Sequence, residues 1–401
     1  MENPDANEPS CSRTFVPYNP LPMARGTDTA KRKRRFRHTR DFWGRVTEGL
    51  ALHQLGSQFM SEVKASYGLY SKDVDWEEIS QKRGRVRRLL RSIWALFLAI
   101  LMKLSPSRRV LLLVAIVLLV WNIDNRWQAV GVAILFVLLA IELADRVTMK
   151  RDLEIAREIQ EWLVPKNPPI VPGIGIAFAT RPQNTVAGDY YDAFLRPLPS
   201  RDSETQPLLI AVADVAGKSV PAALLMATFQ ASLRALTATS APLDEIVIGL
   251  DRYCRAHSLD GRRFTTAFLA EVNTTTREML YVNAGHNDPI LRRATGEVER
   301  LASGGPPFGV PLFTEDEVPY SAGRVQMHPG DLLFIFTDGV IEAVDDKEME
   351  YGEARLIPLI RNAPIESADE TLKRVMADVN TFVGYARQHD DITCMVLRID
   401  A

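Results

Sequence analysis

The chain has 401 residues, 46% of them hydrophobic and 24% charged, so it can bury one sizeable core and carry accessory segments. Its formal net charge of −2 gives no overall attraction to nucleic acid, and we expect no nucleic-acid partner. The three cysteines, Cys11, Cys254 and Cys394, share no metal-ligand spacing and cannot all pair. This excludes a disulfide framework and favours a reduced, cytosolic setting.

Residues 1–104 are expected to form two regions. Residues 1–40 are polar, contain prolines and include the basic run KRKRRFRHTR at 31–40, which predicts a disordered basic tail. The run could contact nucleic acid, contact anionic lipid or be a solvated tail, and we prefer the solvated tail. Residues 41–104 have a loosely amphipathic pattern, and their final apolar run, 93–104, is too short to span a bilayer. We expect an amphipathic or interfacial helical region there.

Residues 108–144 contain two apolar runs, Val110 to Ile123 and Trp127 to Leu143, separated by the polar tip 124–126. Each run falls slightly short of the roughly 20 residues of a perpendicular span. A buried hairpin of a soluble protein is the alternative, but the first run has no polar face, which favours a transmembrane hairpin. Basic residues flank the pair on both sides: Arg108, Arg109, Arg146, Lys150 and Arg151. By the positive-inside rule both ends lie in the cytoplasm, so we expect a cytoplasmic (inner) membrane protein with its catalytic domain in the cytoplasm.

A charged segment from Glu142 to Leu163 follows the hairpin and ends before Pro165. Its apolar residues recur every three or four positions, which predicts a helix with one apolar stripe. The stripe could pack on the following domain or on a second copy of the chain. We prefer a dimerising linker helix at residues 145–165, and therefore a homodimer.

The pattern changes at Gly173 to short β-branched runs separated by turn residues. The predicted strands are Ile174–Thr180, Leu208–Ala213, Phe264–Val272, Glu278–Asn283, Pro289–Arg293, Val298–Leu301, Leu332–Phe336 and Thr393–Ile399. Turns at Asn273-Thr274 and Thr295-Gly296 predict two hairpins, and residues 221–236 predict a buried helix. Regular alternation of strands and long helices is absent, so we expect an α+β domain at 170–401 with antiparallel sheets flanked by helices.

Four short aspartate-bearing motifs, at 188–192, 214–218, 337–339 and 390–393, stand out in this domain. Three of them adjoin predicted strands. A rigid sheet can hold Mg²⁺ or Mn²⁺ with carboxylates at strand ends, because these ions take oxygen ligands at fixed short distances. Four crowded carboxylates could not all ionise unless cations neutralised them. The pattern predicts a binuclear metal hydrolase.

These motifs belong to a longer ordered series: Glu158-Ile159-Gln160, Leu163-Val164-Pro165, Ala187-Gly188-Asp189-Tyr190-Tyr191-Asp192, Asp214-Val215-Ala216-Gly217-Lys218-Ser219, Asn283-Ala284-Gly285-His286-Asn287, Pro329-Gly330-Asp331, Thr337-Asp338-Gly339-Val340-Ile341-Glu342-Ala343 and Asp390-Asp391-Ile392-Thr393. Residues from about Leu153 to Arg398 thereby resemble the PPM-type metal-dependent protein phosphatases, in their bacterial SpoIIE- and RsbU-like branch. Residues 1 to about 145 have no part in the resemblance. It implies an α-β-β-α sandwich of two antiparallel sheets with two Mn²⁺ or Mg²⁺ ions at one end.

The resemblance also implies a set of metal ligands. Asp214 would bridge both ions, and the main-chain carbonyl of Val215 would be a further ligand. Asp338 and Asp390 would complete the first metal, while Asp189 would act on the second directly or through water. Asp214 and Asp338 are the expected catalytic residues.

Other motif residues are expected to support these ligands. Asp192 and Asp391 are expected to support the ligand residues without binding a metal ion themselves. We prefer Asp390 to Asp391 as the direct ligand. Gly217 would allow a sharp backbone turn. Lys218 is either a phosphate contact or a solvated turn residue.

The chain departs from the family pattern in two places. Ala216 stands where many eukaryotic relatives have a histidine credited with protonating the leaving group, so we assign no general acid. Ser219 stands where the bacterial branch usually has glycine. His286 has two readings, catalytic or structural, and we prefer a hydrogen-bonding histidine in a turn.

The resemblance implies a phosphatase that hydrolyses phosphoserine or phosphothreonine through a metal-bridging hydroxide. The predicted hairpin at residues 108–144 would tether it to the membrane. By analogy, its substrate would be a phosphorylated protein of the anti-sigma-factor antagonist class, which would place the chain in sigma-factor regulation. A catalytically silent phosphatase fold used as a signalling scaffold is one alternative, although all the carboxylates are present. A metal-dependent phosphodiesterase is another, but the motifs are poor in basic residues.

Overall fold

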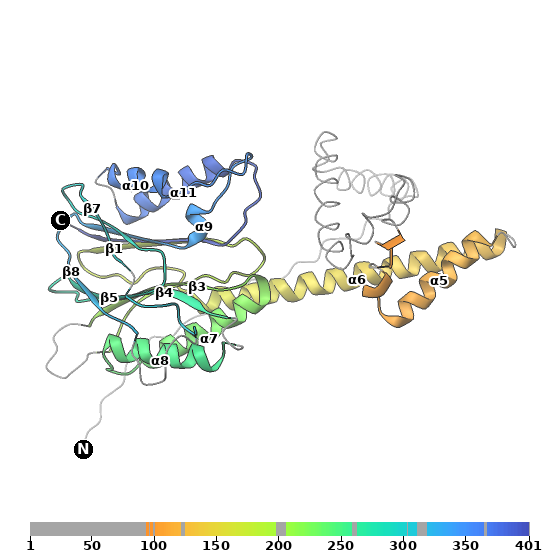
Figure 1. Ribbon diagram of the computed structural model, residues 1–401, viewed down its shortest axis with the longest axis horizontal. Helices are drawn as coiled ribbons and strands as arrows, with labels where there is room; N and C mark the ends of the chain where they lie inside the picture. The colour runs from red at the N-terminus through yellow and green to blue at the C-terminus, as the bar shows by residue number, and fades with distance from the viewer. Residues whose placement is uncertain are drawn as a thin grey trace, which may run out of the picture. The chain divides into compact units, whose positions relative to one another are not determined.

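The computed structural model describes residues 94–95, 97–98, 101–121, 125–197, 206–258, 263–302, 304–310, 319–364 and 367–400. The chain divides into two compact units, Met1–Leu139 and Ala140–Ala401 (Figure 1). The predicted basic tail and most of the predicted interfacial region lie outside the described residues.

Two helices cover the region of the predicted hairpin. Helix α5 spans Pro106–Val120 and helix α6 spans Asn125–Leu163. The helices pack closely where Gly131 of α6 meets α5, since a Cβ on Gly131 would lie 3.2 Å from the carbonyl oxygen of Ala115. Small residues allow this approach of two helix backbones. Within the described part of the chain, α6 alone has the length and apolar composition needed to cross a membrane.

Helix α6 also joins two segments that the sequence analysis separated. The second apolar run and the charged linker form one helix of 39 residues, without a break near residue 144. The sequence from 132 to 163 contains neither proline nor glycine, so nothing in it interrupts the hydrogen-bond ladder.

The second unit contains two five-stranded antiparallel sheets. One has the order β1-β10-β9-β6-β7 and the other β2-β3-β4-β5-β8. The strands are β1 Ile174–Arg181, β2 Tyr190–Leu195, β3 Leu208–Val215, β4 Thr265–Val272, β5 Glu278–Ala284, β6 Ile290–Arg292, β7 Val298–Arg300, β8 Gly323–Gln326, β9 Leu332–Phe336 and β10 Ile392–Ile399. The expected α+β sandwich of antiparallel sheets is therefore present.

Helices cover the outer face of each sheet (Figure 1). Helices α7 (Ser219–Thr237) and α8 (Leu243–Ala256) pack on the sheet that contains β3, and α9 (Asp338–Ile341), α10 (Glu353–Arg361) and α11 (Ala368–Val383) pack on the sheet that contains β9. A third apolar cluster fills the space between the sheets and includes Ile210, Phe268 and Leu333. Because side chains alternate along a strand, each central strand supplies both an inner and an outer core.

The predicted strands and both hairpins are confirmed, with ends displaced by one or two residues. The structure adds β2 and β8, which the sequence analysis did not predict. Strand β2 begins inside the motif at 188–192, and β8 is a four-residue edge strand with only one large apolar side chain, Val325.

Candidate active site

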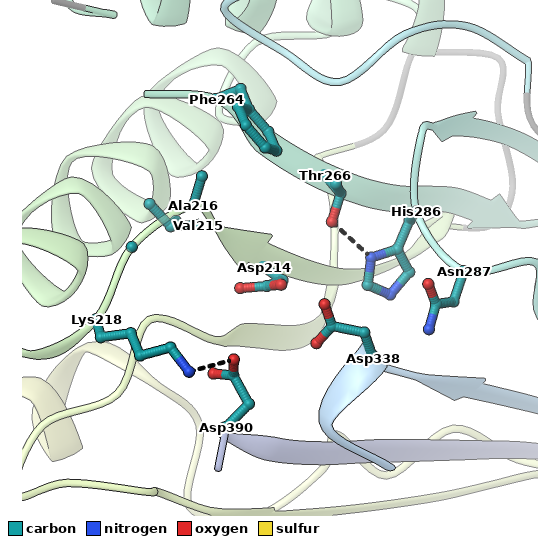
Figure 2. A pocket seen from close by; sticks show the side chains of 11 residues that line it. Asp214, Val215, Ala216, Lys218, Phe264, Thr266, His286, Asn287, Asp338 and Asp390 are labelled. Atoms are coloured by element: carbon teal, nitrogen blue, oxygen red, sulfur yellow. Dashed lines mark hydrogen bonds and ion pairs between the residues drawn. The ribbon is translucent and has the colours of Figure 1, made fainter. Parts of the chain in front are cut away.

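Three aspartates from three different motifs line one cavity of about 200 Å³ (Figure 2). Asp214 lies near the end of β3, Asp338 is the first residue of α9, and Asp390 precedes β10. Strand ends from both sheets thus meet at one end of the sandwich. Val215, Gly217 and Lys218 line the same cavity.

Close backbone packing fixes two of these motifs against each other. A Cβ on Gly339 would overlap the carbonyl of Asp391, so only glycine fits there. Gly217 has a φ of 125°, a conformation that glycine adopts readily and other residues rarely do. Ser219 also has a positive φ, 63°, which accounts for the glycine usual at this position in the bacterial branch.

Asp189 is buried just before β2 and does not line the cavity itself. Its Oδ2 accepts a hydrogen bond of 3.0 Å from the hydroxyl of Thr337, the residue before Asp338. The same Thr337 oxygen accepts a hydrogen bond of 3.0 Å from the main-chain N–H of Thr393. One buried hydroxyl therefore connects three of the four motifs.

Asp390 and Asp391 face different partners. The carboxylate of Asp391 accepts hydrogen bonds of 2.6 Å from the N–H groups of Gln183 and Gly188 and so holds the loop before Asp189. Asp390 lines the cavity, where its Oδ2 lies 2.9 Å from the ammonium of Lys218. This arrangement favours Asp390 as the residue available to a cation.

The structure does not bring Asp192 into the cavity. It lies on the face of β2 that α7 covers, where the guanidinium of Arg234 donates to both carboxylate oxygens at 2.8 and 2.9 Å. Tyr190 donates a further hydrogen bond of 2.6 Å. Asp192 and Tyr190 share this face because they are two residues apart on one strand. Asp192 therefore anchors α7 to the sheet and does not support a ligand.

Burial and mutual repulsion disturb the ionisation of the carboxyl groups. Burial, followed by the charges of Asp338 and Asp390, raises the pKa of Asp214 to about 7. Burial, followed by Glu342 and Asp390, raises the pKa of Asp338 to about 6. The pKa of Asp189 is also raised, first by burial and then by the charge of Asp214. The site therefore concentrates negative charge that a cation would relieve.

The donor chemistry fits divalent cations. Carboxylates of Asp214, Asp338 and Asp390 share the cavity with the backbone of Val215, and all are oxygen ligands of the kind that Mg²⁺ and Mn²⁺ take. Gly188 has no side chain, and this leaves room beside the Val215 carbonyl. A Cβ on residue 188 would lie 3.3 Å from that carbonyl oxygen. Among the described residues, no three His, Cys, Asp or Glu side chains are grouped as they stand so that they could hold a metal ion together. The fit therefore rests on ligand type and shared charge.

The cavity also includes residues that the sequence analysis did not place there: Phe264, Thr266, His286 and Asn287. Phe264 directly precedes β4, and Thr266 is the second residue of that strand, where it pairs with Asp214 of β3. His286 does make the hydrogen bond expected of a structural histidine, 3.0 Å to Thr266, but its ring also lines the cavity. The position of Thr266 opposite Asp214 could be found only after the strand register was known.

Comparison with known proteins relates this part of the chain to a known family. The profile of the family described as Stage II sporulation protein E (SpoIIE) matches residues 204–400, which include Asp214, Asp338 and Asp390. This domain matches the SpoIIE family. Asp189 lies just before the matched range and joins the SpoIIE-family residues through Thr337.

Two curated relatives resemble this chain over lengths greater than that of the matched SpoIIE domain. Protein IcfG of Synechocystis is 26% identical over 287 residues, which are 65% of this chain and 43% of IcfG. The phosphoserine phosphatase RsbU of Bacillus subtilis is 27% identical over 252 residues, 62% of this chain and 70% of RsbU. The chain thus matches less than half the length of the first relative and about two thirds of the second.

A solved structure shares the fold of the SpoIIE-family domain. The SiaA-PP2C domain of Pseudomonas aeruginosa superimposes with a TM-score of 0.54 at 22% identity, covering 64% of this chain and 99% of that domain. The likeness is one of fold.

Proposed function

We propose that this chain is a metal-dependent protein phosphatase that hydrolyses phosphoserine or phosphothreonine. The observation that carries the proposal is the meeting of Asp214, Asp338 and Asp390, from three motifs distant in sequence, around one cavity. The relationship to RsbU, a phosphoserine phosphatase, supports the substrate class.

The proposed site holds two Mn²⁺ or Mg²⁺ ions. Asp214 would bind both ions with the Val215 carbonyl as a further ligand, Asp338 and Asp390 would hold the first, and Asp189 would act on the second. When bound, the ions supply positive charge for the phosphoryl oxygens and lower the pKa of water. Thr337 orients Asp189, and Asp391 holds the backbone from Gln183 to Gly188.

Lys218 adds a cation of the protein's own at the cavity. Its ammonium pairs with Asp390 and donates a hydrogen bond of 2.6 Å to the carbonyl of His389. In the proposed enzyme a metal ion at Asp390 would compete with this pair, and Lys218 would then be available to a substrate phosphate.

We further propose that the chain is tethered to the cytoplasmic membrane through the α5–α6 region, with the SpoIIE-family domain in the cytoplasm. The length and composition of α6 support this. The proposed substrate is a phosphorylated anti-sigma-factor antagonist, an extension from the family resemblance. The charged half of α6 is proposed as a dimerising linker, since Ile155, Ile159 and Trp162 are exposed along it.

Hydrolysis of p-nitrophenyl phosphate and a phosphoserine peptide by the purified full chain tests the proposed activity. We expect turnover with Mn²⁺ or Mg²⁺, no turnover with chelator, and a loss of at least about 100-fold in Asp214→Asn, because a bridging carboxylate is removed. Asp244→Asn, at the exposed start of α8, is the matched control and should retain activity. Full turnover in chelator or in Asp214→Asn would contradict the proposal.

A further inference from the structure

His286 is held firmly at the edge of the cavity. It follows β5 in a turn where Gly285 has a φ of 65°, and its main-chain N–H donates a 2.8 Å hydrogen bond to Oδ1 of Asn283. Only 5% of the residue is exposed. The ring position is therefore set by the fold and not by solvent.

The Nδ1 atom of the ring is already occupied. It lies 3.0 Å from the hydroxyl of Thr266, which is paired with Asp214 across β3 and β4. Directly paired residues point to the same face of a sheet, so Thr266 and Asp214 both face the cavity (Figure 2). If the hydroxyl donates to Nδ1, the ring proton lies on Nε2.

Two side-chain nitrogens next to each other in sequence remain without partners. Nε2 of His286 and Nδ2 of Asn287 are both enclosed, and neither makes a hydrogen bond of normal geometry to another described residue. The main chain of Phe336 lies close enough to the His286 ring to raise its pKa slightly against the larger effect of burial. Both residues line the cavity beside Asp338 (Figure 2). Buried polar groups are nearly always hydrogen-bonded, so an unpaired couple of this kind indicates a missing ligand.

The ligand must offer acceptor oxygens. Burial lowers the pKa of His286 to about 4, so the imidazole is neutral near pH 7 and its N–H donates without carrying a charge. The carboxylates that line the same cavity, Asp338 among them, are the expected holders of cations. The two N–H groups are then left for an anion that such cations would also bind. A phosphoryl group has both the charge and the free oxygens required.

We propose that His286 Nε2 and Asn287 Nδ2 form a pair of hydrogen-bond donors that binds the phosphoryl oxygens of the substrate. The inference rests on the proposed phosphatase function and adds to it two substrate-binding residues. The pair transfers no proton and forms no covalent bond; it positions the phosphoryl group against the acidic side of the cavity. Because the pair would contact any bound phosphate, inorganic phosphate is a sufficient probe.

The test measures binding of inorganic phosphate to the full chain by calorimetry in the presence of Mg²⁺, together with kcat and KM for p-nitrophenyl phosphate. His286→Phe keeps the ring shape and removes the donor, and we expect phosphate to bind about 10- to 100-fold more weakly. His286→Gln should recover part of this loss, because its amide can present an N–H near the position of Nε2. Asn287→Leu should also weaken binding.

The controls separate substrate binding from folding and from metal binding. His328→Phe, at an exposed histidine in the turn before β9, should bind phosphate as the unsubstituted chain does. Melting temperature and Mg²⁺ affinity should be unchanged in His286→Gln and Asn287→Leu. If His286→Phe fails to fold, these two variants decide the question.

The two proposals can fail separately. Unchanged phosphate affinity and KM in the folded variants would overturn the donor pair while leaving the phosphatase intact. Loss of Mg²⁺ affinity in His286→Gln would overturn it too, since the imidazole would then serve a metal. If the chain binds phosphate through the pair but shows no turnover, the phosphatase proposal fails and the donor pair stands.

Discussion

At the scale of single residues, the hydroxyl of Thr337 carries more connections than any aspartate beside it. It donates to Asp189 and accepts from the N–H of Thr393, so it joins the strand ends of both sheets. Thr337 is fully buried, and loss of its hydroxyl would remove one hydrogen bond from Asp189 and leave the N–H of Thr393 unpaired. Threonine before Asp338 therefore has a structural role in this chain.

Thr337→Val removes these hydrogen bonds while keeping the shape of the side chain. We expect the free energy of unfolding to fall by about 1–3 kcal/mol and turnover to fall with it, because Asp189 loses its orientation. Thr337→Ser keeps the hydroxyl and should remain close to the unsubstituted chain in both respects. Denaturant unfolding and p-nitrophenyl phosphate hydrolysis measure the two effects. A valine variant with full stability and full activity would contradict this role.

At the scale of elements, the end of α6 contacts the loop that leads to Asp189. The amide of Gln160 donates to the carbonyl of Ala187 at 2.7 Å and accepts from its N–H at 3.0 Å, as a neighbouring strand would. Ala187 precedes Gly188, whose N–H is held by Asp391. A shift of the helix would therefore reach the loop before Asp189 through two hydrogen bonds.

Gln160→Ala removes this link without altering the exposed surface of α6. We expect turnover to fall about 10-fold, with the free energy of unfolding lowered by only about 1–2 kcal/mol. Glu154→Ala, in an exposed pair with Lys150 on the same helix, is the control and should leave turnover unchanged. Ile159→Ala, on the exposed stripe, tests the dimerising role and should change turnover without changing the fold. Full activity in both Gln160→Ala and Ile159→Ala would show that α6 does not influence the site.

At the scale of the whole molecule, the acidic cavity should make the metal-free protein sensitive to pH. The pKa of Asp214 is raised to about 7 and that of Asp338 to about 6. In an unfolded chain the pKa of an aspartate is about 4. A folded state with raised carboxyl pKa values binds protons more tightly than the unfolded state. Stability from these groups is thus greatest below about pH 4 and falls as the pH rises toward 7.

Melting temperatures of the full chain with chelator should therefore decrease between pH 5.5 and pH 8. Adding Mg²⁺ or Mn²⁺ at pH 8 should raise the melting temperature, because the ions bind the folded state and neutralise the carboxylates. Asp214→Asn should show a weaker dependence on both pH and metal. A melting temperature in chelator that does not fall with pH would contradict the raised pKa values.

Local patterns in the sequence predicted much of this molecule. Strands such as β3 and β9 are continuous apolar runs, and Asp214 and Asp338 lie at their ends, so both the sheet and the acidic site could be anticipated. The short edge strand β8 has no comparable run, and the polar motif at the start of β2 concealed a strand. Their formation depends on pairing with strands distant in sequence.

The remaining site residues depend on geometry that no local pattern contains. Thr266 reaches the cavity because it is paired with Asp214, and His286 because the turn after β5 points its ring inward. The reverse holds for Asp192. Its motif predicted a place in the site, but side chains alternate along β2 and this one points toward Arg234. A shift of one residue along a strand reverses such an assignment.

The pairing of β1 with β10 has a consequence for engineering. Ile174 and Ile399 are direct partners, so the first and last strands of the sandwich are neighbours. A short linker could join these ends, and the chain could be reopened in the exposed turn at 273–276 to give a circular permutant. Such a permutant would keep all four aspartate motifs in one fold while detaching them from the helix that precedes β1. The permutant and the unaltered chain would have the same catalytic residues. A comparison of their activities would show whether that helix controls the site.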